Sequence, residues 1–126
     1  MMLSHVSIGV RSVPTSKRFY DAVFGALGYR CLTEGASYLG YGASEPAFWV
    51  LQGEQPVAAH PGSGLHFCFD APSTASVRHF HAAGLRSGGS DNGAPGVRAD
   101  YSADYYAAFL NDPDGYRLEA YCRGKE

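Results

Sequence analysis

Apolar and polar residues alternate in the first strand-like stretch of the chain and then change to a helical period. In HVSIGV, residues 5–10, the three apolar side chains after the histidine share one face, as they do in a β-strand. Pro14 follows in a short link, and Phe19, Val23 and Leu27 then recur at helical spacing, which predicts an amphipathic helix. Three further strands are expected, at about 30–34, 37–42 and 47–52.

The second half of the chain repeats this pattern at a constant offset. HFCFDAPSTASVRHFHAAG, residues 66–84, is again a strand, a proline-bearing link and a helix, so that His66 corresponds to His5. The long segment GGSDNGAPGVRADYSA, residues 88–103, is expected to be the most mobile loop. The order is βαβββ, twice, which predicts the α+β fold class. The strands expected after the second helix lie at about 86–90, 104–111 and 116–122.

Glycine and proline separate the two halves. GEQPVAAHPGSG, residues 53–64, is typical of a linker between modules. The whole chain has 126 residues, of which 45% are hydrophobic, and this is enough for one compact core. We therefore expect a single domain over residues 1–126, built from modules at about 1–53 and 64–123.

Charge and composition exclude several classes of function. The formal net charge is −2 and the sequence has no Lys/Arg cluster, which argues against nucleic acid or an anionic membrane as a partner. No apolar run approaches the roughly 20 residues of a membrane span, and we expect a cytoplasmic protein with a small-molecule substrate. The three cysteines are widely spaced without a C-x-x-C pair, which indicates buried, reduced thiols.

Strand alternation brings three chemically distinctive residues to one face. In the last expected strand, Leu118 and its apolar neighbours would face the helices, so Glu119 would face the other way. The same alternation turns His5 and His66 away from the apolar faces of their strands. If all apolar faces pack under the two helices, His5, His66 and Glu119 point together into the concave side of the sheet.

Two imidazoles and a carboxylate that converge on a cavity form a typical metal-ligand set. The imidazole nitrogens donate lone pairs, and the carboxylate offsets part of a divalent charge. Three protein ligands leave positions open for water or substrate. The sequence therefore predicts a divalent metal cofactor, Fe, Mn, Ni, Co or Zn, held by His5, His66 and Glu119. Two satisfied histidines and a glutamate that faces the cavity are the alternative reading.

At these residues the chain resembles the vicinal oxygen chelate superfamily, which includes glyoxalase I, extradiol dioxygenases, fosfomycin-resistance transferases and bleomycin-binding proteins. The resemblance implies two βαβββ modules that form a cup-shaped mixed sheet with the helices on its outer face. It also implies a metal that binds vicinal oxygens of a substrate and stabilises a developing enolate by Lewis acidity. The segments that carry it are SHVSIGV, FYDAVFGALGY, HFCFDAPS and YYAAFLNDPDGYRLEAY.

The chain departs from glyoxalase I at the end of the first module. Glyoxalase I has a further carboxylate ligand there, which serves in proton transfer. The corresponding stretch here is AFWVLQ, residues 47–52, and the next glutamate, Glu54, lies beyond the strand. A fourth protein ligand is therefore not expected. No general base is identified, and the catalytic residues are left unassigned.

The remaining ligand set equals the facial triad of non-haem iron enzymes and also suits extradiol cleavage. Extradiol enzymes need further acid or base groups, and Tyr101, Tyr105 or Tyr106 could donate a proton here. Strand alternation also suggests which side chains line the cavity. The residues expected to contact substrate are Trp49, Tyr105, Arg117 and Tyr121.

Three functions remain in consideration. The first is a metal-dependent enzyme of glyoxalase or dioxygenase type that acts on a small oxygen-bearing substrate. The second is a bleomycin-resistance type protein that binds an antibiotic-like molecule, and the third is a thiol transferase of the fosfomycin-resistance kind. In each case we expect a homodimer, because the modules would leave sheet edges exposed.

Overall fold

The computed structural model describes residues 2–55 and 62–124, in which the same series of elements occurs twice. The first module consists of β1 (Val6–Val10), α1 (Val13–Leu27), β2 (Arg30–Gly35), β3 (Tyr38–Gly42) and β4 (Phe48–Gln52). The second consists of β5 (Phe67–Asp70), α2 (Thr74–Arg86), β6 (Ser90–Val97), β7 (Tyr105–Asn111) and β8 (Arg117–Arg123). The predicted α+β class with two βαβββ modules is confirmed. Part of the expected linker, residues 56–61, lies outside the described residues.

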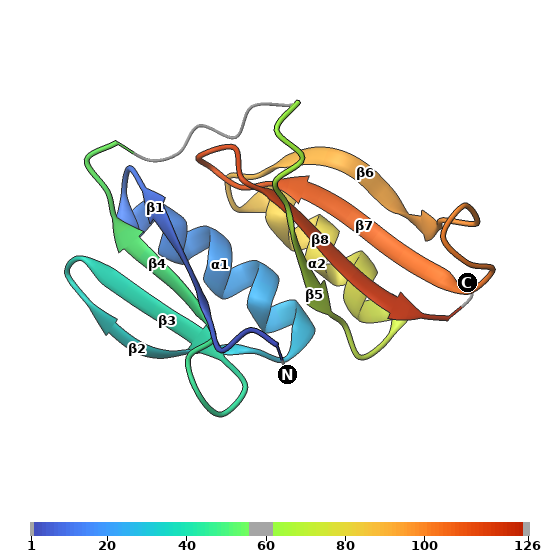
Figure 1. Cartoon of the computed structure of the whole chain (residues 1–126), viewed down its shortest axis with the longest axis horizontal. Coiled ribbons are helices and arrows are strands. Elements are labelled where there is room, and N and C mark those ends of the chain that lie inside the picture. The colour runs from blue at the N-terminus through green and yellow to red at the C-terminus, as the bar shows by residue number, and fades with distance from the viewer. Residues whose placement is uncertain (1, 56–61, 125–126) are drawn as a thin grey trace.

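Each module forms a four-stranded mixed sheet with the same topology. The strand orders are β1-β4-β3-β2 and β5-β8-β7-β6. The first and last strands of each module pair in parallel, and the other neighbours are antiparallel. In Figure 1 the two sheets stand side by side with both helices behind them, and β1 and β5 are the edges that face each other.

Both helices begin at a serine cap. The Ser12 side chain accepts a hydrogen bond from the Thr15 amide, and Pro14 occupies the first turn, where its missing N–H costs nothing. Ser73 caps α2 in the same way. Gly28 ends α1 at φ +89°, a left-handed conformation that favours glycine. Neither helix in the described segments is long and apolar enough to cross a membrane.

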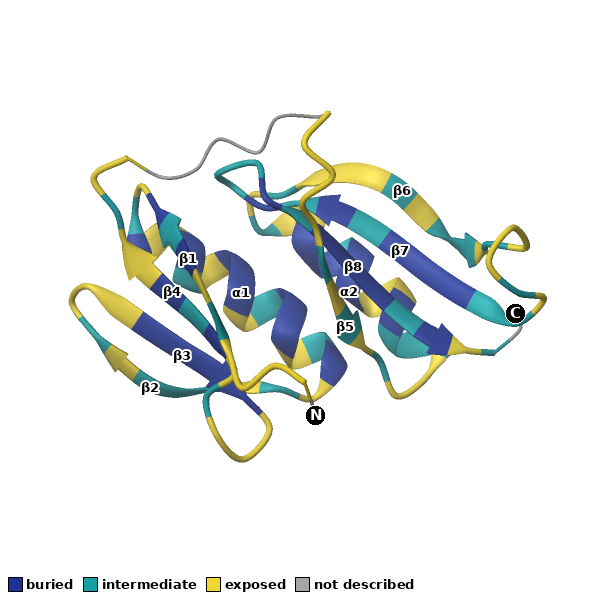
Figure 2. Cartoon of the chain, in the orientation of Figure 1, coloured by how far each residue is buried: buried dark blue, intermediate teal, exposed yellow. Residues whose placement is uncertain are grey.

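An aromatic core joins the two modules. Phe24 of α1, Phe48 of β4 and Phe69 of β5 pack together, with ring centroids 4.9 to 5.4 Å apart. In Figure 2 the central strands and the inner faces of the helices are buried, whereas β2 and β6 at the outer edges are mostly exposed or intermediate. Because both helices pack against one continuous core, the other face of each sheet is turned away from the helices.

Polar contacts also tie the modules together at the turn before β8. The Tyr20 hydroxyl of α1 donates to Asp112 Oδ2 at 2.6 Å, and the Tyr116 hydroxyl donates to the Gly9 carbonyl at 2.7 Å. Arg11 forms an ion pair with Asp114 at 2.9 Å. The DPDG turn therefore holds β8 in a defined position relative to β1 and α1.

The predicted position of the first strand after the second helix is wrong, because the strand begins later in the sequence. Residues 86–90 were predicted as a strand, but α2 continues to Arg86, and β6 occupies Ser90–Val97, inside the segment expected to be a mobile loop. Its sequence contains Gly93 at φ +150° and Pro95, and its pairing with β7 shifts register twice. Such residues are tolerated at a sheet edge. Pairing with β7 overrides the weak local propensity for strand.

Candidate functional site

Glu119 lies in the middle of β8 and is the buried carboxylate of the candidate site. The residue is 3% exposed, although Leu118 and Ala120 beside it supply the apolar face of the strand. In the sheet it lies opposite Cys68 of β5 and Phe109 of β7. Strand alternation therefore turns Glu119 to the face away from the helices, as the sequence predicts. A buried carboxylate needs partners, and the structure provides two.

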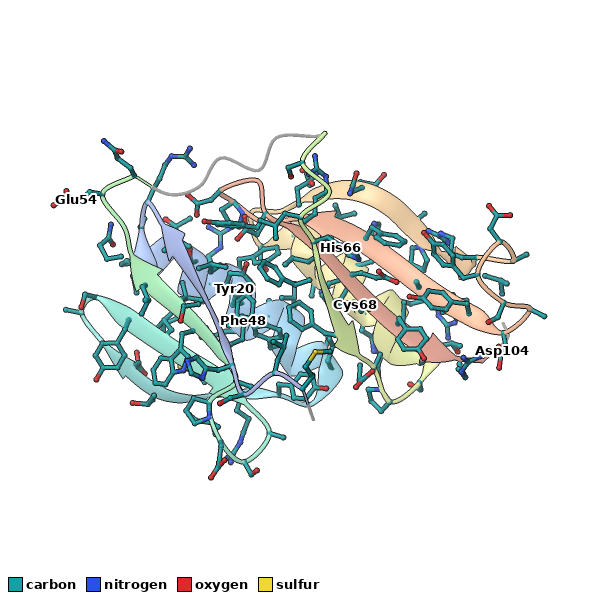
Figure 3. All side chains as sticks on the ribbon, in the orientation of Figure 1. Tyr20, Phe48, Glu54, His66, Cys68 and Asp104 are labelled. Atoms are coloured by element: carbon teal, nitrogen blue, oxygen red, sulfur yellow. The ribbon has the colours of Figure 1, made fainter. Side chains whose placement is uncertain are left out.

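His66 is the first partner of Glu119. It immediately precedes β5, and its Nε2 lies 3.2 Å from Glu119 Oε1. Glu119 accepts this hydrogen bond in the His66 tautomer that carries a proton on Nε2. The His66 side chain is 49% exposed, whereas the Glu119 side chain is 4% exposed. His66 is therefore accessible from solvent, whereas the Glu119 carboxylate is enclosed. Figure 3 places His66 and Cys68 along β5, beside β8.

Tyr105 of β7 is the second partner. Its hydroxyl donates to Glu119 Oε2 at 2.6 Å. The ring stacks on Tyr121 with centroids 4.5 Å apart, and Tyr101 meets it edge-on at 4.9 Å. Burial, and then the hydrogen bond to Glu119, raise the pKa of Tyr105, so the phenol stays protonated and remains a donor. Tyr105 therefore holds one carboxylate oxygen in a fixed orientation.

Cys68 lies beside the same carboxylate but is not an activated nucleophile. Although Cys68 is an exposed residue, partial desolvation of its thiol against the sheet, and then the charge of Glu119, raise the pKa of Cys68 to about 12. A thiol with such a pKa is protonated at neutral pH and reacts slowly. Cys31, Cys68 and Cys122 form no disulfide, but the expectation that they are buried is correct only for Cys122, since Cys31 is half-buried and Cys68 is exposed.

His5 lies apart from the His66–Glu119 pair in this chain. It precedes β1, is exposed, and its Nδ1 lies 3.1 Å from the Ser4 hydroxyl. Across residues 2–55 and 62–124, no three His, Cys, Asp or Glu side chains come together in a group that could hold a metal ion. The internal repeat places His5 and His66 at corresponding positions of separate sheets. Correspondence in a repeat does not make two residues neighbours.

Two cavities adjoin these residues. The larger, of about 670 Å³, lies between the modules and is lined by aromatic rings such as Phe24, Phe48 and Phe69, with His5 and His66 also on its wall. The smaller, of about 250 Å³, lies over the second sheet. The chemically functional and aromatic side chains on its wall are those of His66, Asn92, Tyr101, Phe109, Arg117 and Glu119.

The residues expected to contact substrate are distributed unevenly. Arg117 lines the smaller cavity, and Tyr105 and Tyr121 form the stacked pair beside Glu119. Trp49 lies in β4 opposite Ser7 and next to Tyr38, and it lines neither of the two cavities described above. Tyr106 is buried on the helix side of β7. Its hydroxyl accepts a hydrogen bond from the Arg78 guanidinium at 3.4 Å.

Sequence reasoning did not assign Asn92 or Phe109 to the smaller cavity. Asn92 lies in β6, in the segment expected to be a loop, so no strand face could be assigned to it. Phe109 was within an expected strand, but its position opposite Glu119 depends on the register between β7 and β8. A phenylalanine in an apolar stretch gives no signal that distinguishes a cavity wall from core.

The donor set around Glu119 is partly suited to a metal ion. His66 and Glu119 are chemically appropriate ligands, and their atoms lie within 3.2 Å, as two ligands of one ion would. Glu119 pairs with His66, which is positively charged only when it is protonated. A bound cation would compensate the buried negative charge of Glu119. Within one chain the described residues supply two of the three expected ligands, because His5 is elsewhere.

Comparison with known proteins places this architecture in a family. No family model matches the chain, and no curated protein does. Among solved structures, a glyoxalase/bleomycin resistance protein from Albidiferax ferrireducens is 35% identical over 98% of this chain and 100% of its own, with a TM-score of 0.83.

Two more distant structures share the fold. A glyoxalase/bleomycin resistance protein/dioxygenase family enzyme from Burkholderia phytofirmans is 17% identical, with 94% of this chain and 95% of that chain covered and a TM-score of 0.71. A fosfomycin resistance protein from Mesorhizobium loti is 19% identical, with 94% and 89% covered and a TM-score of 0.70. On the strength of the 35% identical structure and the repeated βαβββ modules, the chain belongs to the glyoxalase/bleomycin resistance/dioxygenase superfamily.

Proposed function

We propose that this protein is a metal-dependent enzyme of glyoxalase or dioxygenase type that acts on a small oxygen-bearing substrate. The observation that carries the proposal is the buried Glu119 carboxylate, which His66 contacts at 3.2 Å and Tyr105 at 2.6 Å. His66 and Tyr105 supply hydrogen bonds to this enclosed carboxylate, and a bound cation would in addition compensate its negative charge. In the proposed site His66 and Glu119 bind a divalent ion, which when bound acts as a Lewis acid toward substrate oxygens.

The chain's own residues prepare this site. Tyr105 donates to Glu119 Oε2 and leaves Oε1, which faces His66, for the ion. Stacking against Tyr121 keeps the Tyr105 ring in place, so the carboxylate does not have to be ordered when the metal binds. Tyr105 is therefore a positioning residue. Arg117 on the cavity wall would contact substrate directly.

The third ligand in this proposal is His5 from the other chain of a homodimer. His5 is exposed just before β1, and β1 and β5 are both edge strands of their sheets. Leu3 beside it is 63% exposed, and Leu65 beside His66 is 40% exposed, so both segments carry apolar surface that a second copy would cover. A two-fold axis would bring His5 of each chain to the His66–Glu119 pair of the other.

The test is metal binding by Glu119→Gln. This change preserves the size of the side chain but removes its charge, so divalent affinity should fall tenfold or more, as changes around metal ligands do. His5→Ala and His66→Ala should have the same effect, whereas His79→Ala, an exposed histidine on α2, should not. Metal content is measured in protein purified without a histidine tag.

Thermal melting with and without added Mn²⁺, Ni²⁺ or Zn²⁺ gives a second readout that is independent of activity. Metal at 100 times its Kd should stabilise the native protein by about 2.7 kcal/mol and raise the wild-type Tm. The Glu119→Gln midpoint should barely respond. If Glu119→Gln retained metal and gained the same thermal stabilisation as the wild type, the metal proposal would be wrong.

A metal-free binding protein is the second candidate. The larger cavity between the modules favours it, since its aromatic walls suit an apolar or aromatic ligand. This candidate predicts that ligand affinity is unchanged by chelators and by Glu119→Gln. The metal enzyme predicts that both treatments weaken binding.

A further inference from the structure

The smaller cavity contains an arrangement that is not needed to hold a metal ion. One side is formed by the His66–Glu119 pair, and Arg117 and Asn92 also line the wall. Arg117 and Glu119 are two positions apart on β8, so they share a face, with Cα atoms roughly 7 Å apart. The permanently charged Arg117 therefore lies close enough to the proposed metal position for one small ligand to contact both.

The other walls of this cavity are aromatic and are held in position. Phe109 lies opposite Glu119 in the β7–β8 register. The guanidinium carbon of Arg98 lies 5.3 Å from the centre of the Phe109 ring, and its nitrogens donate to the carbonyls of Gly96 at 2.9 Å and Ala94 at 2.6 Å. Tyr101 also lines the cavity. Rings of this kind present flat apolar surfaces to a planar ligand.

Size and charge limit what this cavity can hold. Its volume of about 250 Å³ is below the roughly 300–1,000 Å³ of sites for drug-sized ligands, so a single ring or a short planar chain fits best. Arg117 is the one Lys or Arg among its described lining residues. A planar carboxylate matches one guanidinium fork, whereas phosphate sites usually gather several cationic or backbone donors.

We propose that the substrate is a small planar carboxylic acid with at least one further oxygen atom. Its carboxylate binds Arg117 and Asn92, its planar part lies against Phe109 and Tyr101, and its further oxygen reaches the His66–Glu119 position. This inference rests on the proposed function for the last of these contacts only. Arg117 already has an interaction in the structure, but a guanidinium has five N–H donors and can bind a carboxylate as well.

The experiment compares two probes that differ in a single carboxylate, 3,4-dihydroxybenzoate and catechol. Binding is measured by calorimetry, with Zn²⁺-supplemented and with metal-free protein. The wild type should bind 3,4-dihydroxybenzoate at least about tenfold more tightly than catechol, since hydrogen bonds to charged groups are the strong ones. Arg117→Gln should abolish this preference and leave the affinity for catechol unchanged.

Arg123→Gln is the matched control, because Arg123 is on the same strand and face but is ion-paired with Asp104 and lies outside the cavity. It should retain the full preference. Asn92→Ala, on the exposed edge strand β6, should reduce the preference and serves if Arg117→Gln does not fold. Equal affinity of the wild type for both probes, or a preference that survives both substitutions in folded protein, would overturn the inference.

The two proposals fail in different ways. If Zn²⁺ strengthens the binding of both probes equally but the carboxylate adds nothing, the carboxylic acid inference is wrong and the metal site stands. If the carboxylate preference depends on Arg117 but Zn²⁺ has no effect on either probe, the metal site is wrong and the ligand class stands.

Discussion

Two buried carboxylates in this protein have different surroundings. Asp112 is 4% exposed, and it accepts hydrogen bonds from the Tyr20 hydroxyl and from the amides of Asp114 and Tyr116. Glu119 is 3% exposed and accepts from Tyr105 and His66, beside a cavity. Asp112 is thus enclosed by rigid donors and joins the modules. Glu119 has one accessible partner, His66, with which it could share an ion.

Tyr20→Phe tests the structural role of Asp112. The change removes the donor to Asp112 Oδ2 and leaves a buried charged oxygen without that partner, which should lower the free energy of unfolding by about 2–3 kcal/mol. Tyr41→Phe is the matched control, because the Tyr41 hydroxyl donates to Asp21, an exposed residue that water can solvate. That change should cost less than about 1 kcal/mol. Urea denaturation at neutral pH measures both, and equal losses would contradict this account.

Tyr20 should also make stability sensitive to alkaline pH. Burial, and then the charge of Asp112, raise the pKa of Tyr20 well above its usual 10.0. The contribution is fully present below pH 10.0, where the unfolded tyrosine is protonated, and is lost as the pH rises toward the folded-state pKa. Tyr20→Phe should therefore lose less stability than the wild type between about pH 8 and pH 11. Urea denaturation of both proteins at these two pH values checks this. If both lost the same stability, Tyr20 would not be a source of the alkaline sensitivity.

At the scale of elements, the two helices differ in how closely their glycines approach the core. Gly84 of α2 lies where a Cβ atom would meet the Leu110 side chain and would come within 3.2 Å of Val23. Gly25 of α1 is exposed, and a Cβ atom there would meet nothing within 4 Å. The missing side chain at Gly84 therefore lets α2 pack against α1 and β7. At Gly25, no described residue lies close enough to require the absence of a side chain.

Substitution of these glycines by alanine should have opposite effects. Gly25→Ala should stabilise the protein by about 0.5–1 kcal/mol, because alanine favours the helix and nothing obstructs its methyl group. Gly84→Ala gains the same helix propensity, but overpacking against the fully buried Leu110 should outweigh it by about 1 kcal/mol or more. Thermal and urea denaturation measure both changes. Stabilisation by Gly84→Ala would mean that the α2–β7 contact relaxes easily.

At the scale of the whole molecule, the separate location of His5 determines how the proposed site would be assembled. His5 does not join His66 and Glu119 in a metal-binding group within the described chain. If the proposed homodimer supplies His5 from the other chain, each site draws on two copies. In a mixed dimer of two such variants, both defects could then fall in one site and leave the other site intact.

Mixing His5→Ala with Glu119→Gln tests this arrangement. In a heterodimer with shared sites, one site has both defects and the other has none, so up to half of the metal capacity of the mixed dimers should return. If each site lay within one chain, every site would contain one defect and no capacity would return. The subunits are exchanged by unfolding and refolding together, the dimer is verified by light scattering, and bound metal is counted against each variant refolded alone. A strictly monomeric protein would exclude the shared site.

The local features of this fold were predictable from the sequence. The alternation in residues 5–10 assigns the buried face of β1, and the serine and proline before each helix indicate where it begins. The repeat between the two halves predicts the βαβββ order, and alternation in the last strand predicts that Glu119 faces away from the helices. Side-chain direction within one element depends on the backbone period alone, so a single sequence contains it.

Only the tertiary structure decided which of these residues are neighbours. Phe109 lies opposite Glu119 because of the β7–β8 register, and Asn92 reaches the cavity because β6 pairs with β7 despite its glycines and proline. His66 lies against Glu119 because β5 runs beside β8, whereas His5 belongs to the other sheet. Such contacts join residues distant in the chain. They depend on strand pairing and packing between modules, for which neither periodicity nor composition carries a signal.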